Sequence, residues 1–118
     1  MSAADPPCIF CRIVAGTLPS TQVYADDHVI AIQDLNPQAP VHVLVLPRQH
    51  VVGIASEEAE DGALLSHLVS VANRIARERQ IADGGYRLVI NQGANGGQTV
   101  AHLHLHVLGG RRMQWPPG

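Results

Sequence analysis

The sequence predicts an α+β fold in which one long helix packs on an antiparallel sheet. Five segments have the apolar or alternating pattern of β-strands, four of them clearly, and they occur both before and after the single long helical pattern. Several connections between neighbouring strands are of hairpin length, which favours antiparallel pairing. No internal repeat and no second region of different composition is visible in the 118 residues. We therefore expect a single domain over residues 1–118, with residues 111–118 as a short tail.

The composition excludes several classes of protein. With 46% hydrophobic residues the chain is predicted to be globular and not disordered. A formal net charge of −2 argues against binding to a nucleic acid polymer, although a single nucleotide needs only local donors. No apolar run approaches the roughly 18 residues of a membrane span, so we expect no membrane partner. Residues 1–7 lack the basic start of a secretory signal, and there are only two cysteines. Both features favour a cytoplasmic, reducing setting.

A short helix is expected at the N-terminus. Asp5 is a capping residue followed by two prolines, which indicates a helix from about Pro6 to Ala15 that ends at Gly16. Cys8 and Cys11 are three residues apart and therefore lie on one face of this helix. The rest of its surface is apolar because of Ile9, Phe10 and Ile13.

The next segments predict a hairpin and a buried central strand. Residues 21–25 and 28–33 are strand candidates joined by Asp26-Asp27, and the prolines of 34–40 indicate a loop. Residues 41–46 are almost continuously apolar, as in a strand covered on both faces. The one polar member is His42, for which a core histidine bonded to a backbone carbonyl remains an open alternative.

A long amphipathic helix is expected to open at Ser56, with Glu57 and Glu58 at its positive end. Its apolar stripe has helical spacing and consists of Leu64, Leu65, Leu68, Val71, Ala72 and Ile75. Residues 86–91 then form the fourth predicted strand.

The final strand candidate, residues 101–108, alternates histidines with aliphatic residues. His102, His104 and His106 would share one face of the strand, while Leu103, Leu105 and Val107 face the core. Neighbouring histidines would then have Cα atoms roughly 6.5–7 Å apart. At that spacing each imidazole can take a different role around one small anion, or two can share a metal ion.

A glycine-rich loop, residues 93–97, directly precedes this strand. Glycines allow backbone N–H groups to approach phosphate oxygens without obstruction. Asn91 and Thr99 add an amide and a hydroxyl at the two rims of the loop. We therefore expect an anion-binding cleft with His104 as its nucleophile, since an imidazole with a pKa of about 6.5 is mostly neutral at pH 7.

These motifs together resemble the histidine triad (HIT) family. The resemblance is carried by residues 8–10, 34–47 and 96–111, and residues 113–118 resemble the ending of its nucleotide-binding, phosphoramidase branch. It implies an antiparallel five-stranded sheet with one long and one short helix, in a homodimer whose two sheets join. It also implies hydrolysis of purine nucleoside phosphoramidates or acyl-nucleotides through a covalent nucleotidyl-histidine.

The resemblance also implies roles for individual residues. The catalytic set would be the nucleophile His104, with His106, His42 and Thr99 beside it. Asp34 would accept the ribose hydroxyls, and an apolar clamp would hold the purine: Ile9, Phe10, Ile13, Ile32 and Leu35. The phosphate and leaving group would meet Asn91, Gly97, Gln98 and, from the tail, Trp115. The chain departs from the family at two of these positions: Thr99 replaces the usual serine, and Ile32 stands where an aromatic residue is common.

A structural zinc site is also implied by the resemblance. Cys8, Cys11, His50 and His102 match positions at which relatives, including the galactose-phosphate uridylyltransferases, place zinc ligands, and zinc takes four ligands in a tetrahedron. The alternative for the two cysteines is a redox pair, but no strand precedes them and no βαβ unit follows. This zinc would not be needed for catalysis.

Two alternative functions remain open. Beside the covalent hydrolase, the chain could be a nucleotide-binding interaction module with little turnover, or a metal-dependent hydrolase in which the histidine row itself holds the ion.

Overall fold

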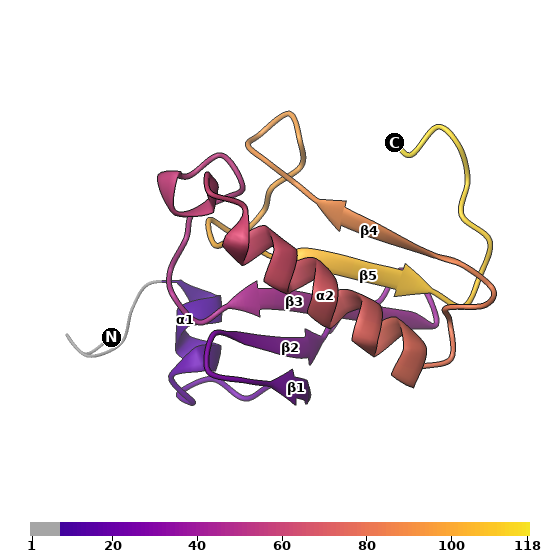
Figure 1. Ribbon diagram of the computed structural model, residues 1–118, viewed down its shortest axis with the longest axis horizontal. Helices are drawn as coiled ribbons and strands as arrows, with labels where there is room; N and C mark the ends of the chain where they lie inside the picture. Colours follow the sequence, from indigo (N-terminus) through magenta and orange to yellow (C-terminus); the bar gives the residue numbers. More distant parts are fainter. Residues whose placement is uncertain (1–7) are drawn as a thin grey trace.

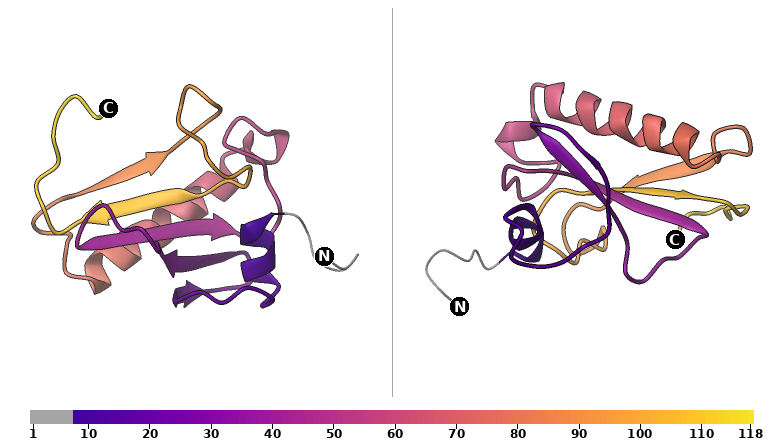
Figure 2. Two further views of the ribbon diagram at one scale, coloured as in Figure 1. Left: turned by 180° about the vertical axis from the view of Figure 1, so that it is seen from behind. Right: turned by 90° about the horizontal axis from the view of Figure 1, so that it is seen from below.

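The computed structural model of the protein describes residues 8–118. Five antiparallel strands form one sheet in the order β1-β2-β3-β5-β4, with helix α2 across one face and helix α1 against the other (Figures 1 and 2). The strands are β1 (Gln22–Ala25), β2 (Val29–Gln33), β3 (Val41–Pro47), β4 (Tyr86–Ile90) and β5 (Leu105–Gly109). The predicted α+β class and its five-stranded antiparallel sheet are confirmed.

Each face of the sheet has its own hydrophobic core. On the α2 face, Val43 and Val45 of β3 pack with Leu68 and Ile75 of the helix. On the α1 face, the alternate residues of the same strand, Leu44 and Leu46, pack with others that include Phe10 and Ile30. Strand β3 is therefore covered on both faces, as its continuous apolar sequence predicts.

Helix α2 spans Ala63–Glu78 and begins later than its sequence indicated. The Ser56-Glu57-Glu58 signal starts only a short 3-10 turn, Glu57–Ala59, and the Ser56 hydroxyl accepts from the Gly53 N–H without capping any helix. Gly62, at φ +80°, interrupts the helical backbone, and the Asp61 carboxylate accepts from the Ala63 N–H. The expected start at Ser56 was wrong because this left-handed glycine divides the segment.

Helix α1 spans Ile9–Val14, and Gly16 follows it with φ +80°, as expected of a glycine after a helix. The expected Asp5 cap and the first prolines lie outside the described residues. Within the described chain the cap residue is Cys8, whose sulfur accepts from the Cys11 N–H at 3.4 Å.

The histidine-bearing strand is shorter than predicted. Strand β5 begins at Leu105, so His102 and His104 precede it. The Leu103 N–H donates to the Val51 carbonyl instead of to a neighbouring strand. Leu103, Leu105 and Val107 nevertheless face the core on the α2 side, in agreement with the alternation in the sequence.

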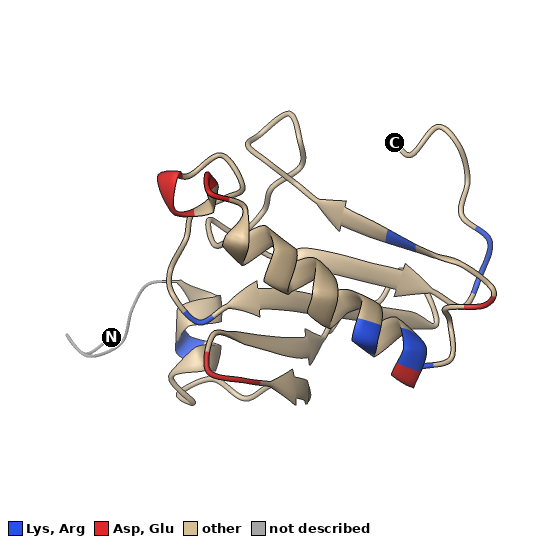
Figure 3. Ribbon diagram, in the orientation of Figure 1, with Lys and Arg blue, Asp and Glu red and all other residues tan. Residues whose placement is uncertain are grey.

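Charged side chains are absent from the strands that form the centre of the sheet. Figure 3 shows Asp, Glu and Arg mainly on the helices and connections, while β2, β3 and β5 carry none. Histidine is thus the one titratable residue type that these three strands bring to the interior. None of the helices within residues 8–118 combines the length and the apolarity needed to cross a membrane.

Candidate functional site

Three histidines, His42, His104 and His106, lie together on the α1 side of the sheet and are called here the imidazole cluster. Strand β3 pairs with β5 so that Leu44 is opposite His106, which brings His42 to the same region. Ring centroids are 5.2 Å apart for His42 and His106, and 5.1 Å apart for His104 and His106. Residues 64 positions apart in the chain therefore form one continuous set of imidazoles.

His104 is held by the backbone next to it. Its side chain is 7% exposed, and Nδ1 lies 2.7 Å from the His102 carbonyl oxygen. A carbonyl only accepts, so Nδ1 carries the proton and Nε2 keeps its lone pair. Neutral imidazole in this tautomer is a nucleophile at Nε2.

His42 and His106 form a hydrogen-bonded pair whose tautomers follow from one amide. The Gln38 N–H donates to His42 Nδ1 at 3.0 Å, so the ring proton of neutral His42 is on Nε2. That Nε2 lies 2.9 Å from His106 Nδ1 and 3.4 Å from an Asp34 carboxylate oxygen. His106 Nδ1 is then the acceptor, and its Nε2–H is a donor. The carbonyl-bonded core histidine considered for His42 was wrong, because its backbone partner is an N–H group.

Burial keeps this pair neutral at ordinary pH. It lowers the pKa of His42, with Asp34 opposing part of the shift. The pKa of His106 falls to about 4, first because of burial and then because of His104 and His42. The pair therefore offers a neutral donor, and not a fixed positive charge, to an anion bound beside His104.

A cavity of about 460 Å³ opens beside the imidazole cluster. It is lined by most of the residues expected to bind a nucleotide: Ile9, Phe10, Ile13, Ile32, Asp34, Leu35, Thr99, His104 and His106. The wall is mainly apolar. Its polar groups among the predicted residues are the Asp34 carboxylate, the Thr99 hydroxyl and the imidazoles of His104 and His106. An apolar chamber with a few convergent polar groups is the usual form of a small-molecule site.

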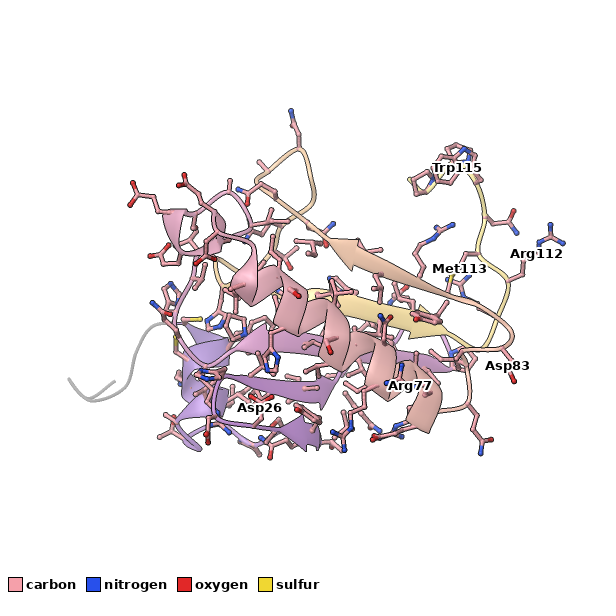
Figure 4. The ribbon with its side chains drawn as sticks, in the orientation of Figure 1. Asp26, Arg77, Asp83, Arg112, Met113 and Trp115 are labelled. Atoms are coloured by element: carbon pink, nitrogen blue, oxygen red, sulfur yellow. The ribbon has the colours of Figure 1, made fainter. Side chains whose placement is uncertain are left out.

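Four of the expected binding residues do not line this cavity. The Asn91 side-chain amide donates to the Gly96 carbonyl, and the Gln98 amide donates to the Val52 carbonyl, so both hold the glycine-rich loop in shape. Gly97 has φ +79°, which accounts for a glycine there. Trp115 is 82% exposed and lies at the opposite end of the molecule from α1 (Figure 4).

Sequence reasoning missed six residues of the cavity wall, namely Leu18, Pro19, Ser20, Gln33, Leu44 and Val100. Leu44 was predictable, because it is two positions from His42 on the same strand and so shares its face. The segment containing Leu18 carries no such signal, since it reaches the cavity only through the turn after α1.

A second group of side chains, Cys8, Cys11, His50 and His102, is called here the thiol cluster. Cys11 Sγ lies 3.1 Å from His50 Nδ1 and 3.5 Å from His102 Nδ1, and Cys8 Sγ lies 3.4 Å from His102 Nδ1. All four donor atoms fall within 4.8 Å of one another. Two sulfurs and two imidazole nitrogens converging in this way form a donor set that fits a tetrahedral metal ion.

The surroundings of the thiol cluster favour metal ligation over redox chemistry. His102 is fully buried, and its Nε2–H donates to the Pro47 carbonyl at 2.8 Å, which leaves Nδ1 facing the sulfurs. Such an outer contact is typical of a ligating histidine. Burial, with Cys8 adding to it, raises the pKa of Cys11 to about 11, whereas a reactive thiol needs a lowered pKa. A bound cation reverses this effect because it deprotonates the thiol.

Asp34, His42 and His106 also bring three donor atoms within 4.8 Å of one another. This is the arrangement that a metal ion held by the histidine row would use. Two of its three members, however, are already bonded to each other, and the contact uses the Nδ1 lone pair of His106. A metal ion would have to displace that hydrogen bond, just as it would displace the Cys11–His50 contact. The thiol cluster is nevertheless the better donor set, because it brings four donors together, two of them sulfurs.

Comparison with known proteins gives one consistent result. The sequence model of the HIT domain matches residues 15–113. A 14 kDa zinc-binding protein of Zea mays is 46% identical over 116 residues, which cover 97% of this chain and 90% of the relative. The crystal structure of a HIT family hydrolase from Legionella pneumophila superimposes with a TM-score of 0.90 at 43% identity, covering 94% of this chain and 99% of that one.

A more distant structure bears on the metal. It is a Zn-bound histidine triad family protein from Mycobacterium smegmatis, with a TM-score of 0.76 and 34% identity, covering 89% of this chain and 76% of that one. The name of one relative and the bound zinc of one solved structure thus agree with the four converging donors of the thiol cluster.

Proposed function

Because the chain belongs to the HIT domain family, we propose that it is a nucleotidyl hydrolase that cleaves purine nucleoside phosphoramidates or acyl-nucleotides and releases the nucleoside monophosphate. The observation that carries the proposal is the hydrogen bond from His104 Nδ1–H to the His102 carbonyl, in a side chain that lines the cavity. It makes Nε2 of His104 the free nitrogen beside the space for substrate.

In the proposed first step, His104 Nε2 attacks the α-phosphorus, a P–N(His) bond forms, and the bond from phosphorus to the leaving amine breaks. The amine departs with one proton taken from solvent, whereas the carboxylate of an acyl-nucleotide departs as the anion. The ring becomes a nucleotidyl-imidazolium, whose positive charge is stabilised by the His102 carbonyl 2.7 Å from Nδ1. The Nε2–H of neutral His106 is the donor suited to the phosphate oxygens.

In the second step, water attacks phosphorus and the P–N(His) bond breaks. The electron pair returns to Nε2, the water releases one proton to solvent, which balances the proton taken up in the first step, and the nucleoside monophosphate leaves. Because imidazole is both a good nucleophile and a good leaving group, the same residue serves both half-reactions. Asp34, at the cavity wall beside the pair, is the carboxylate proposed to accept the ribose hydroxyls, with the apolar wall around Ile32 and Phe10 for the base.

The test is a panel of adenosine and guanosine phosphoramidates with different amines, followed in single-turnover mixtures quenched with base. Mass spectrometry should find a nucleotide covalently attached to His104. Release of monophosphate without any such adduct, under conditions that preserve phosphohistidine standards, contradicts the covalent route. Tight nucleotide binding with neither adduct nor product favours the interaction-module alternative.

We also propose that the thiol cluster holds structural zinc, through Cys8, Cys11, His50 and His102. The donor chemistry supports zinc, which binds two thiolates and two imidazoles tetrahedrally. When bound, zinc supplies cross-linking of α1 to the sheet and no chemistry on the substrate. Retention of turnover after chelation at low temperature would separate this proposal from the metal-dependent alternative.

A homodimer with joined sheets is proposed on the same family grounds. Strand β4 supports it, because β4 is the sheet edge on one side and all five of its residues are partly exposed. An edge strand of this kind offers unpaired backbone groups to a second copy. The exposed Trp115 is then available to the partner's cavity. Sedimentation at micromolar concentration should give the mass of two chains, and a monomer would contradict the proposal.

A further inference from the structure

His102 takes part in both clusters at once. Its imidazole Nδ1 faces the two sulfurs of the thiol cluster, while its own carbonyl accepts from His104 Nδ1–H. The residue is 0% exposed and is held on its other side by the Pro47 carbonyl. A ligand that fixes the His102 side chain therefore acts on the residue whose backbone orients His104.

Phe10 makes a second connection between the clusters. It lies between Cys8 and Cys11 in the sequence and is 5% exposed. Its ring meets His102 edge-on, with centroids 5.8 Å apart at 87°, and meets His104 with centroids 5.0 Å apart at 74°. The same ring lines the cavity beside His104. One aromatic side chain thus touches a metal-ligand candidate, the nucleophile candidate and the nucleotide space.

Helix α1, which carries this ring, is too short to be stable alone. It has six residues, whereas isolated helices shorter than about 12–15 residues are marginal in water. Its attachments are the packing of Phe10 and Ile13 on the sheet and the approach of Cys8 and Cys11 to His50 and His102. Without a metal ion to cross-link the cysteines and histidines, the position of Phe10 depends on this apolar packing and on weak thiol–imidazole contacts.

We infer that metal binding at the thiol cluster and nucleotide binding in the cavity are positively coupled, and that Phe10 carries the coupling. The inference rests on the proposed function and adds a regulatory property to its site. Metal at the thiol cluster holds α1 so that Phe10 stays against His104, and a nucleotide packed on Phe10 holds α1 in the position that ligates metal. Linkage requires both effects to have the same size.

Two measurements on the full chain test the coupling. The first is the Kd for AMP and for GMP, by titration calorimetry, with zinc-loaded and with chelator-stripped protein. The second is the rate of zinc release from loaded protein to an excess of a chromophoric chelator, with and without saturating nucleotide. We expect stripped protein to bind nucleotide at least about fivefold more weakly, and nucleotide to slow zinc release. If stripped protein unfolds, the release rates alone decide.

Two substitutions on α1 separate coupling from simple loss of the cavity wall. Phe10→Ala should weaken nucleotide binding and also abolish the dependence on zinc. Ile13→Ala removes another wall residue of α1 and should weaken binding equally in both forms, so that the ratio of the two Kd values persists. Phe10→Leu, which restores apolar bulk without the ring edge, is used if the alanine variant is not folded by circular dichroism.

Each outcome has a definite meaning. Equal Kd values with and without zinc, or a Phe10→Ala protein that keeps the full zinc effect, overturn the inference while the proposed function stands. Absence of nucleotide binding in both zinc-loaded and stripped wild type overturns both. Weaker nucleotide binding by stripped protein together with slower zinc release in the presence of nucleotide, both lost in Phe10→Ala and kept in Ile13→Ala, supports the coupling.

Discussion

His102 and His104 lie two residues apart and both contact Phe10, but a carbonyl group holds a different nitrogen in each. In His104 the Nδ1–H donates to the carbonyl of His102, which leaves Nε2 free beside the cavity. In His102 the Nε2–H donates to the carbonyl of Pro47, which leaves Nδ1 facing Cys8 and Cys11. The comparison teaches that the partner of one ring nitrogen decides the chemistry available to the other.

The surroundings of the two clusters differ in a related way. The thiol cluster can supply two anionic sulfurs, which match a divalent cation. The imidazole cluster contains the neutral pair of His42 and His106, and the Nε2–H donor of His106 matches an anion. Residues 102–106 thus contribute histidines to two sites that suit ligands of opposite charge: His102 to a cation site, and His104 and His106 to an anion site.

The largest effect is expected where the nucleophile is removed. His104→Ala should lower turnover by at least about four orders of magnitude, because a covalent route has no substitute for its attacking nitrogen. Nucleoside monophosphate binding should persist, since most of the cavity wall is unchanged. Turnover and titration calorimetry measure the two effects. The matched control is His28→Ala, at an exposed position outside both clusters. Turnover by His104→Ala above the level of wild-type contamination would contradict the assignment of His104 as the nucleophile.

The corresponding change in the thiol cluster should act on stability before it acts on chemistry. Cys11→Ala leaves three donors, so zinc content by elemental analysis and melting temperature should fall together. We expect a drop of about 10 °C, or roughly 2 kcal/mol. Wild type stripped by chelator should melt at the same temperature as the variant.

The redox alternative makes the opposite prediction for Cys11→Ala. It requires purified wild type without zinc and a Cys8–Cys11 disulfide that forms and breaks with activity. A variant that keeps the melting temperature of wild type, in protein shown to be metal-free, would favour it.

Sequence patterns were sufficient for the parts of this structure that depend on periodicity. The central strand around His42 was predictable from its continuous apolar run. The core-facing side of Leu103, Leu105 and Val107 was predictable because alternate strand residues share a face. The start of α2 was not, because Ser56 and Glu57 form a good local start signal and the left-handed Gly62 interrupts the backbone after them. Local propensity cannot choose between two possible starts.

The candidate site likewise has one part that the sequence predicts and one part that it does not. The apolar cavity wall followed from residue type together with the family resemblance, as at Ile32 and Phe10. The tautomers did not, because they depend on a backbone amide, that of Gln38, whose direction is set by the loop conformation. No sequence pattern specifies which ring nitrogen an amide 4 residues away will contact.

The amide of Gln38 gives a direct way to break the arrangement in the imidazole cluster. Gln38→Pro removes the N–H that donates to His42 Nδ1, so the proton of His42 is no longer fixed on Nε2. We expect kcat to fall roughly tenfold or more, with nucleotide affinity nearly unchanged. Nitrogen chemical shifts of the His42 and His106 rings should report mixed tautomers.

The control for this change keeps the amide. Gln38→Ala loses only the side-chain bond to the Asn36 carbonyl and should retain the wild-type tautomers. Wild-type kcat and unchanged ring shifts in the proline variant would show that the loop amide does not determine the state of His42.

The most gradual expected effect is a pH dependence of stability that originates in His106. Its pKa is about 4 in the folded protein and about 6.5 when exposed, so between these values the unfolded chain binds more protons. The free energy of unfolding should therefore be highest above pH 6.5, decrease as pH falls toward 4, and receive no further change from this group below that. One proton limits the slope to about 1.4 kcal/mol per pH unit. Urea unfolding from pH 4.5 to 7.5 should show a shallower slope for His106→Gln than for His28→Gln, whereas equal slopes would mean that His106 does not lie in the buried, neutral pair that distinguishes the imidazole cluster.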